Sequence, residues 1–232
     1  MVLTKYKAVF FDVGGTLIQA HPSVGDIYAQ HARPYGFCGS PDDLNRQFSQ
    51  EWKKIGGMES LLVKGGPEAE TRFWHNLVLN VFAPFGGIRD FDNYFDVVYH
   101  AFTLKNNWLI YNDVVESDIL EKLKRKGIIL GVVSNWDSRL QQTLSNLGLA
   151  HYFDFILAST VVGSAKPDEK IFHEALRQSK VDASEACHIG DEPYADYQGA
   201  SKLGMGSILV DRLNQHRDTK ISPKIRSFLE LT

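Results

Sequence analysis

The feature of this sequence that most limits its fold is a set of short apolar runs, each bounded by a polar residue. Each run is continuous rather than alternating, which is typical of strands buried on both faces of a parallel sheet. Five such runs stand in the chain: Ala8–Phe11, Ile128–Val133, Phe155–Ala158, Cys187–Ile189 and Ser207–Val210. They predict five buried strands with polar side chains at their carboxyl ends.

Helical patterns separate the predicted strands. The clearest begins at Val115 and ends at Lys126, with Gly127 in the position of a C-cap. Three more are predicted over Asp137–Leu147, Asp168–Gln178 and Pro193–Leu203. This alternation predicts a Rossmann-like α/β fold with a doubly wound parallel sheet. In such a sheet, ligands bind beyond the carboxyl ends of the strands.

The stretch from residue 18 to residue 104 differs from the rest of the chain. It is rich in aromatic residues, and it holds no apolar run that is typical of a buried strand. Four helical patterns are predicted in it, over Ser23–Tyr35, Pro41–Ile55, Glu68–Phe82 and Asp90–Phe102. Because a structureless loop of this length is rare in a compact domain, we predict an inserted helical subdomain at 18–104. The α/β core is then formed by residues 1–17 and 105–232.

The composition limits the partners of the chain. Its 232 residues carry a formal net charge of −3, which argues against nucleic acid or an anionic membrane surface as the main partner. No apolar run approaches the roughly 18 residues that a membrane span needs. Cys38 and Cys187 have neither metal-ligand nor redox spacing, so we expect two buried, reduced thiols. These features favour a cytoplasmic location, and no protein partner is predicted.

Polar residues follow the first two predicted strands directly. Asp12 ends the first strand, and the nearby Gly14 and Gly15 allow a sharp turn and the close approach of a ligand. Ser134 ends the second strand and Asn135 follows it; the Ser134 hydroxyl and backbone N–H can bind an anion where the next helix begins. Both features also have ordinary structural interpretations, as a loop-capping carboxylate and as a helix N-cap.

Two further features lie later in the chain. Lys166 precedes Pro167, and a lysine held in the ligand crevice can neutralise a phosphate, although an ordinary surface lysine is the alternative interpretation. Asp191 and Asp196 flank a strand-to-helix turn, and Mg²⁺ binds hard carboxylate oxygens together with water and phosphate oxygens. Acids in the first turn of a helix also stabilise its dipole without any ligand. A last acid, Asp211, follows the final predicted strand.

In this order, and each after a strand, the four features resemble the four motifs of the haloacid dehalogenase (HAD) superfamily. The resemblance covers the whole chain. Within the superfamily the chain resembles the group called haloacid dehalogenase-like hydrolase domain-containing protein 3, on the stretches His21–Gly25, Gly148–Phe155 and Asp196–Gly199. The resemblance implies a HAD core with a helical cap. It also implies a Mg²⁺-dependent hydrolase, in the first place a phosphatase of a small phosphorylated metabolite.

The resemblance further implies a nucleophile and a metal site. Asp12 is the nucleophile that forms an aspartyl-phosphate, which splits the hydrolysis into two easier steps. Asp12, the backbone carbonyl of Gly14 and Asp191 are the ligands of Mg²⁺. Asp196 lies in the outer shell, where it orients the ligands or the lysine.

The same resemblance implies a phosphate-binding set. Ser134 and Asn135 bind the phosphoryl group, and Lys166 binds it while balancing the charge of Asp12. Acidic groups and phosphate oxygens cannot gather at one point without cations, so this arrangement needs both Mg²⁺ and Lys166.

The chain departs from the family pattern at Gly14. Phosphatases of this superfamily carry a second Asp there, which protonates the leaving group and later activates water. General acid–base catalysis is typically worth about 10²–10⁴ in rate, so turnover is slow, limited to good leaving groups, or helped by another residue. His21 and Glu192 are the candidates for that acid, although a histidine before Pro22 is also an ordinary helix-entry residue.

Two other classes of function remain open. Dehalogenases on the same scaffold also lack the second Asp, but they work without metal, and the pair Asp191 and Asp196 argues against that chemistry. Cleavage of a C–P bond needs a cap lysine that forms a Schiff base, for which Lys53, Lys54 and Lys64 are available. The third possibility is a phospho-ligand binding or regulatory protein whose catalytic site is disabled.

Overall fold

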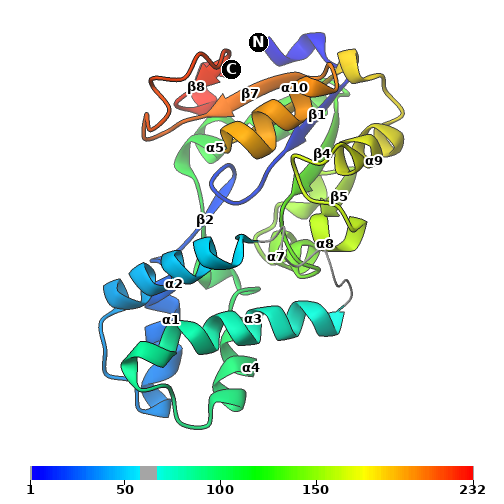
Figure 1. The fold of residues 1–232 in the computed structure, drawn as a ribbon. Coiled ribbons are helices and arrows are strands. Elements are labelled where there is room, and N and C mark those ends of the chain that lie inside the picture. The colour runs from blue at the N-terminus through cyan, green and yellow to red at the C-terminus, as the bar shows by residue number, and fades with distance from the viewer. Residues whose placement is uncertain (1, 58–66, 232) are drawn as a thin grey trace.

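The fold of this chain has a sheet-based part and a helical part, which lie one above the other in Figure 1. The structure is a computed structural model, and it describes residues 2–57 and 67–231. Its main sheet has six parallel strands in the order β5-β4-β1-β6-β7-β8. These are β1 (Ala8–Phe11), β4 (Ile129–Ser134), β5 (Phe155–Ala158), β6 (Ala186–Gly190), β7 (Gly206–Val210) and β8 (Lys224–Ile225). The predicted doubly wound α/β fold is therefore confirmed.

Helices cover both faces of the sheet because side chains of a strand alternate between its faces. Ala8 and Phe10 of β1 pack on one face, and Val9 and Phe11 pack on the other. The first face is covered by α9 (Glu169–Ser179) and α10 (Gly199–Lys202). The second face is covered by α5 (Asn112–Ser117), α6 (Ile119–Arg125) and α7 (Leu140–Asn146).

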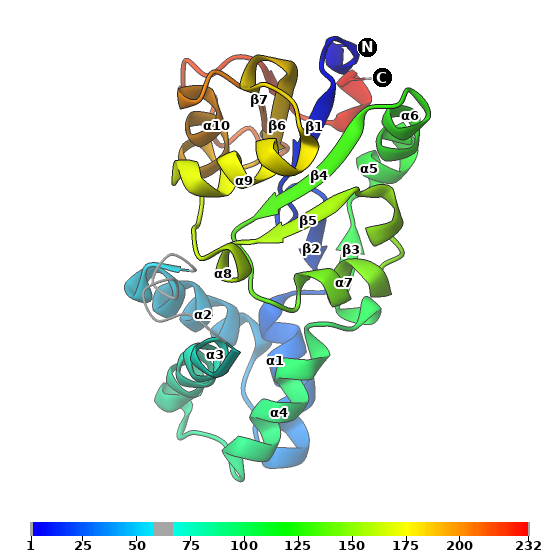
Figure 2. The same ribbon diagram turned by 90° about the vertical axis from the view of Figure 1, so that its right-hand side faces the viewer.

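The order of the strands determines where polar residues gather. The chain leaves β1 for β4 and β5 on one side of it, then crosses to β6 and β7 on the other side. Strands β4, β1 and β6 therefore end side by side, as Figure 2 shows for β4 and β1. A doubly wound sheet binds its ligands at such a switch in strand order.

The helical part consists of four helices with a hydrophobic core of their own. They are α1 (Val24–Ala32), α2 (Pro41–Ile55), α3 (Pro67–Phe82) and α4 (Phe91–Ala101). Ser23 and Ser40 cap the first two helices through their side chains. The fully buried rings of Tyr28, Phe82 and Tyr94 lie at the centre of this core. We call these four helices the helical subdomain.

A short antiparallel ribbon joins the two parts. Strand β2 (Ile18–Ala20) pairs with β3 (Trp108–Ile110), so that the chain enters and leaves the helical subdomain on neighbouring strands. Strand β2 was not expected from the sequence, which predicted no buried strand between residues 18 and 104, and only Ile18 of its three residues is buried. Three residues are too few to produce a readable apolar run, and β2 is stabilised by pairing with a segment about 90 residues away in sequence.

Two of the predicted helices differ in detail from the structure. The helix predicted over Val115–Lys126 is divided into α5 and α6, because Asp118 adopts a left-handed conformation with φ 52°. The helix predicted over Pro193–Leu203 begins with a π-helical turn, Pro193–Gln198, before α10. The remaining short elements are α8 (Ser159–Val162) and 3₁₀ turns at Val2–Lys5, Arg33–Tyr35, Ala83–Phe85, Lys105–Asn107, Ala150–Tyr152, Ala183–Glu185 and Phe228–Leu231.

Two expectations from composition can be compared with the structure. Both cysteines are free, but only Cys187 is buried, so the expectation of two buried thiols is wrong for the exposed Cys38. Among the described residues, no helix combines the length and the apolar character needed to cross a bilayer.

Candidate active site

Asp12 lies directly after β1, between the ends of β4 and β6. Ser134 Oγ donates a hydrogen bond of 2.8 Å to Asp12 Oδ1, and Lys166 Nζ donates one of 2.6 Å to the same oxygen. Burial raises the pKa of the Asp12 carboxyl, while the positive charge of Lys166 acts in the opposite direction. The two donors fix the carboxylate through Oδ1, so Oδ2 is the oxygen left for a reacting atom or a cation.

Lys166 is a fully buried lysine between two carboxylates. Besides Asp12, its Nζ donates to Asp196 Oδ1 over 2.5 Å. Burial by itself lowers the pKa of Lys166, but the charges of Asp12 and Asp196 outweigh burial and raise the pKa above its usual value. Lys166 therefore stays protonated, and the interpretation as a solvated surface lysine is wrong.

Asn135 is engaged with the backbone around Lys166. Its Nδ2 donates to the Lys166 carbonyl over 2.9 Å, and its Oδ1 accepts from the Lys166 backbone N–H over 2.7 Å. The Asn135 side chain thus holds the lysine loop against the end of β4. Direct contact of Asn135 with a phosphate remains a prediction.

Asp196 is buried within the π-helical turn. Its Oδ1 lies 2.8 Å from Nε2 of His188, besides the contact with Lys166, and its Oδ2 accepts from the Glu192 backbone N–H over 3.0 Å. Burial favours a higher pKa for Asp196, but Lys166 and His188 hold it below its usual value. A Cβ on Gly190 would lie 2.1 Å from Asp196 Cγ, so this carboxylate needs a glycine beside it.

Asp191 follows β6 and faces the loop after β1. Thr16 Oγ1 donates to Asp191 Oδ1 over 3.0 Å. Gly15 has φ +78°, and a Cβ there would lie 2.2 Å from Asp191 Oδ2, so both its backbone and its surroundings require glycine. Burial, followed by the charges of Asp12 and Asp196, raises the pKa of Asp191 to about 8. This carboxyl group is therefore short of a positive partner.

The three carboxylates form a group that fits a divalent cation. Asp12, Asp191 and Asp196 each offer an oxygen, and these oxygens lie within 4.8 Å of one another. Among the described residues, the ammonium of Lys166 is the cation hydrogen-bonded to this group. Hard oxygens with a shortage of positive charge are the donors that Mg²⁺ takes. Asp12 and Asp191 have oxygens to spare, whereas both oxygens of Asp196 already accept hydrogen bonds.

Arg212, which the sequence did not indicate as a site residue, stabilises the loop after β1. The Arg212 guanidinium donates over 2.8 Å to the carbonyls of Gly15 and Thr16, pairs with Asp113 at 3.0 Å, and lies 3.8 Å from the centre of the Tyr111 ring. The only signal was its position two residues after the end of β7. Its neighbour Asp211, which directly follows β7 and was noted for that reason, accepts from the backbone N–H groups of Gln215 and His216 and so stabilises its own loop.

Replacing Arg212 by alanine is expected to destabilise the protein. The change breaks an ion pair whose side chains are 17% and 15% exposed, and it leaves Asp113 without its charged partner. We expect a loss of about 3 kcal/mol in the free energy of unfolding, measured by urea denaturation. Arg125→Ala is the control, because its pair with Glu121 is exposed and is worth less than about 1 kcal/mol. Equal losses in the two variants would contradict this account of Arg212.

The Trp136 indole lies beside Gly14, where the family pattern has an aspartate side chain. A Cβ on Gly14 would lie 3.2 Å from Cζ3 of Trp136, so the indole borders the space that an acid at position 14 would enter. The candidate acids lie elsewhere: Glu192 is exposed next to Asp191, and His21 is exposed at the end of β2 that is nearer the helical subdomain. No hydrogen bond joins either side chain to Asp12 among the described residues.

Of the three lysines considered for C–P chemistry, the structure describes two. Lys53 and Lys54 are exposed on α2, and Lys54 pairs with Glu51. Lys64 lies outside the described residues.

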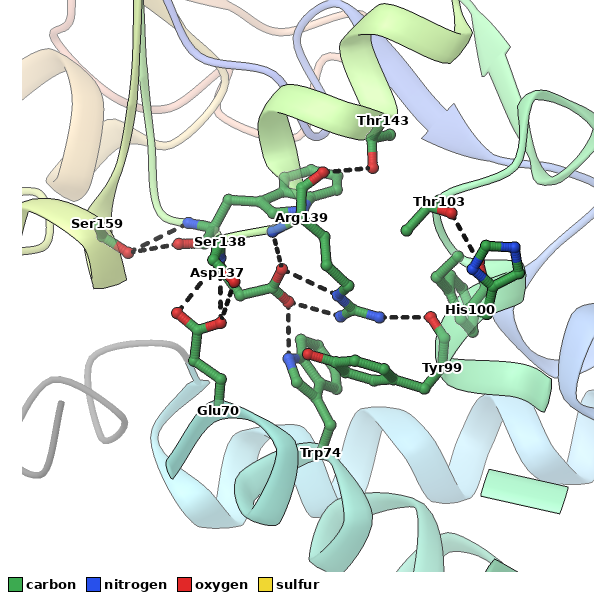
Figure 3. Close-up of polar contacts among 12 residues, drawn as sticks. Glu70, Trp74, Tyr99, His100, Thr103, Asp137, Ser138, Arg139, Thr143 and Ser159 are labelled. Atoms are coloured by element: carbon green, nitrogen blue, oxygen red, sulfur yellow. Dashed lines mark hydrogen bonds and ion pairs between the residues drawn. The ribbon is translucent and has the colours of Figure 1, made fainter. Parts of the chain in front are cut away.

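The helical subdomain contacts the loop that follows Ser134, as Figure 3 shows. Trp74 of α3 donates through Nε1 to Asp137 Oδ2 over 2.7 Å, and Arg139 Nε donates to Asp137 Oδ1 over 3.0 Å. Arg139 also donates to the Tyr99 carbonyl over 2.7 Å, with its guanidinium 3.8 Å from the centre of the Tyr99 ring. The buried carboxylate of Asp137 thus accepts hydrogen bonds from both parts of the molecule.

A second contact lies beside the first in Figure 3. The Glu70 carboxylate, near the start of α3, accepts from the backbone N–H of Ser138 over 3.2 Å and also from the Ser138 hydroxyl. The loop from Asn135 to Arg139 therefore touches the Asp12 site at one end and the helical subdomain at the other.

Known proteins are similar to this chain in sequence. A family model described as haloacid dehalogenase-like hydrolase matches residues 6–204. The mouse (Mus musculus) haloacid dehalogenase-like hydrolase domain-containing protein 3 is 33% identical over 207 residues, which is 88% of this chain and 81% of that protein. Phosphoserine phosphatase of Thermus thermophilus is 37% identical over 108 residues, 46% of this chain and 43% of that enzyme.

Solved structures of two activities resemble the chain. A HAD phosphatase from Thermococcus onnurineus has a TM-score of 0.66 at 25% identity, covering 97% of this chain and 95% of that one. A 2-haloacid dehalogenase from Pseudomonas syringae has a TM-score of 0.64 at 27% identity, covering 97% and 96%. With the carboxylates and the lysine gathered at the ends of β1, β4 and β6, these matches show that the chain belongs to the haloacid dehalogenase-like hydrolase family.

Proposed function

We propose that this chain is a Mg²⁺-dependent phosphatase that hydrolyses a small phosphorylated metabolite in the cytoplasm. The observation that supports this most is the buried Asp12 carboxylate, fixed through one oxygen by Ser134 and Lys166 and surrounded by further acids. A site that gathers carboxylates with one lysine suits a reaction that brings an anionic phosphoryl group together with Mg²⁺. We take residues 18–104 as the cap and residues 1–17 and 105–232 as the core.

The proposed reaction begins at Asp12. Its Oδ2 attacks phosphorus, the P–O bond to the organic group breaks, and an aspartyl-phosphate forms. Ser134 and Lys166 orient the carboxylate and then face the transferred phosphoryl oxygens, where the ammonium offsets their negative charge. Water then attacks phosphorus, which releases inorganic phosphate and returns Asp12 to its carboxylate form.

The other acids have supporting roles in this proposal. Asp191, the Gly14 carbonyl and Asp12 would hold the metal ion, which when bound neutralises charge on the phosphoryl oxygens. Asp196 orients Lys166 through their 2.5 Å contact. Asn135 holds the backbone of Lys166, so the lysine is positioned from two sides.

The proposal is tested by a phosphate-release screen over many phosphorylated metabolites, with and without Mg²⁺. We expect release from at least one of them, and loss of that release when EDTA removes the metal. Release that is unaffected by EDTA would contradict the metal dependence. Tight binding of one phosphorylated compound with no release from any would favour the alternative, a binding or regulatory protein, which the glycine at position 14 and the indole of Trp136 beside it make a real competitor.

The proposed metal site leads to a prediction for Asp191→Asn. The amide keeps the shape and the Thr16 contact but removes the charge, so Mg²⁺ affinity should fall by at least the roughly 10–100-fold that the loss of an outer-shell partner costs. Isothermal titration calorimetry measures the affinity. Asp96→Asn is the matched control, because Asp96 is exposed on α4. Equal Mg²⁺ affinity of wild type and Asp191→Asn would rule out Asp191 as a ligand.

A further inference from the structure

A cavity of about 250 Å³ lies where the helical subdomain meets the sheet-based part. Its walls are formed mainly by aromatic and aliphatic side chains of α1, α2, α3 and α4, together with the two residues Trp108 and Trp136. The chain has four tryptophans, and all of them line this one cavity: Trp52, Trp74, Trp108 and Trp136. So many rings around an open space are unusual for simple packing, since cores fill their interior with side chains.

The charged side chains and the amide on the cavity wall, Asp137, Arg139 and Asn135, are already paired. Asp137 accepts from Arg139 and from Trp74, and Arg139 lies over the Tyr99 ring (Figure 3). Asn135 uses its amide on the backbone of Lys166. A charged or strongly polar ligand group would therefore find no free partner among these residues, whereas an apolar group loses nothing on entry.

The cavity shares a wall with the catalytic site. Trp136 lines the cavity, and its Cζ3 lies 3.2 Å from the position of a Cβ on Gly14, two residues after Asp12. Asn135, which also lines the cavity, follows Ser134, the residue that donates to Asp12. A molecule whose phosphoryl group reaches Asp12 can thus place its remainder against Trp136.

The size and shape of the cavity limit which organic group of a substrate it can hold. A cavity of about 150 Å³ lined by apolar side chains is enough to bind benzene, so about 250 Å³ holds one substituted ring or two fused rings. Part of the wall is a stack of flat rings: Trp52 lies 5.8 Å from Phe48 at 20° and 5.6 Å from Trp74 at 19°. Flat ring faces favour a flat partner.

We propose that this cavity binds the organic group of the substrate and that this group is a flat, apolar aryl group of one or two rings. The inference rests on the proposed phosphatase function for the phosphoryl half of the molecule. In the reaction, Asp12 forms its bond to phosphorus, the bond from phosphorus to the aryl oxygen breaks, and the aryloxide leaves with the electron pair. The aryloxide then takes a proton from water, so no acid at position 14 is needed.

Two measurements on the full chain test this inference. The first titrates 2-naphthol, the dephosphorylated probe, against tryptophan fluorescence; we expect saturable quenching, because every tryptophan lines the cavity. The second compares KM for 2-naphthyl phosphate and phenyl phosphate. We expect a KM about 10-fold lower for the naphthyl ester, because its second ring removes more apolar area from water.

A pair of matched variants locates the effect. Val78→Phe adds a ring at a buried position that lines the cavity, and it should abolish the naphthyl preference and the quenching. Val97→Phe makes the same change at a position on α4 that is 44% exposed, and it should preserve both. If Val78→Phe does not fold, the two wild-type measurements still decide the matter.

The outcomes separate this inference from the proposed function. Equal KM values for the two esters, with fluorescence unchanged by 2-naphthol, would overturn the aryl site even if both esters release phosphate. Saturable binding of 2-naphthol with no phosphate release from any ester would support the aryl site and overturn the phosphatase.

Discussion

Asp12→Asn is expected to abolish phosphate release, with a fall in kcat on the order of 10⁴-fold or more, because it removes the proposed nucleophile. The amide keeps the shape of the side chain and can still accept from Ser134. Lys166 keeps its contact with Asp196, so the buried ammonium retains one carboxylate partner. The fold should therefore persist while the chemistry is lost.

The measurement is steady-state phosphate release on the best substrate of the screen, with circular dichroism to verify folding. Asp96→Asn on the exposed side of α4 serves again as the control and should keep wild-type activity. A second readout is phosphate bound covalently to the protein. Wild type quenched during turnover should carry an acyl phosphate, and Asp12→Asn should carry none. If Asp12→Asn retains activity within 10-fold of wild type, the nucleophile is another group.

Gly14→Asp is expected to raise the turnover of alkyl phosphates by up to the roughly 10²–10⁴-fold that a positioned acid contributes. An alkyl leaving group needs a proton, whereas an aryl or acyl leaving group needs it much less, so the wild type should prefer aryl and acyl phosphates. Gly14 does not have a positive φ, so its backbone allows an aspartate. The new Cβ would however lie 3.2 Å from the Trp136 indole, which must move by a few tenths of an ångström.

The comparison of alkyl and aryl esters needs two companion variants. Gly14→Asn has the same shape without the ionisable group and should leave alkyl turnover low. Gly14→Asp combined with Trp136→Phe gives the new carboxyl group more room and should show the larger gain. If wild type already hydrolyses alkyl esters as fast as aryl esters, a substitute acid exists, and His21→Ala and Glu192→Gln would show which residue supplies it.

The polar residues at the carboxyl ends of the central strands could be predicted from the sequence, for a physical reason. A strand buried on both faces must be continuously apolar, so its end is marked by the first polar residue, as at Asp12 and Ser134. Parallel strands then bring those ends to one edge, where Lys166 and Asp196 join them. Local pattern and sheet topology indicated that Asp12 and Ser134 meet, whereas the places of Lys166 and Asp196 were implied by the family resemblance.

What the sequence did not predict depends on contacts between distant segments. Arg212 stabilises the loop after β1 from nearly 200 residues away. No local sequence pattern around an arginine predicts a contact with so distant a loop. Trp136 was part of a recognised stretch, but its place beside Gly14 depends on how β4 and β1 pair. The contacts of Asp137 with Trp74 likewise require the two parts of the molecule to be packed together.

The ribbon of β2 and β3 has a consequence for the ancestry and engineering of this chain. Ala20 and Trp108 are register partners in an antiparallel pair, so their Cα atoms are about 5 Å apart. A two-residue turn spans such a gap, and it could close the ribbon into a hairpin if the residues between them were deleted. The helical subdomain is therefore attached like a cassette: it can be gained, exchanged or lost at a single point of the chain without rethreading the sheet beneath it.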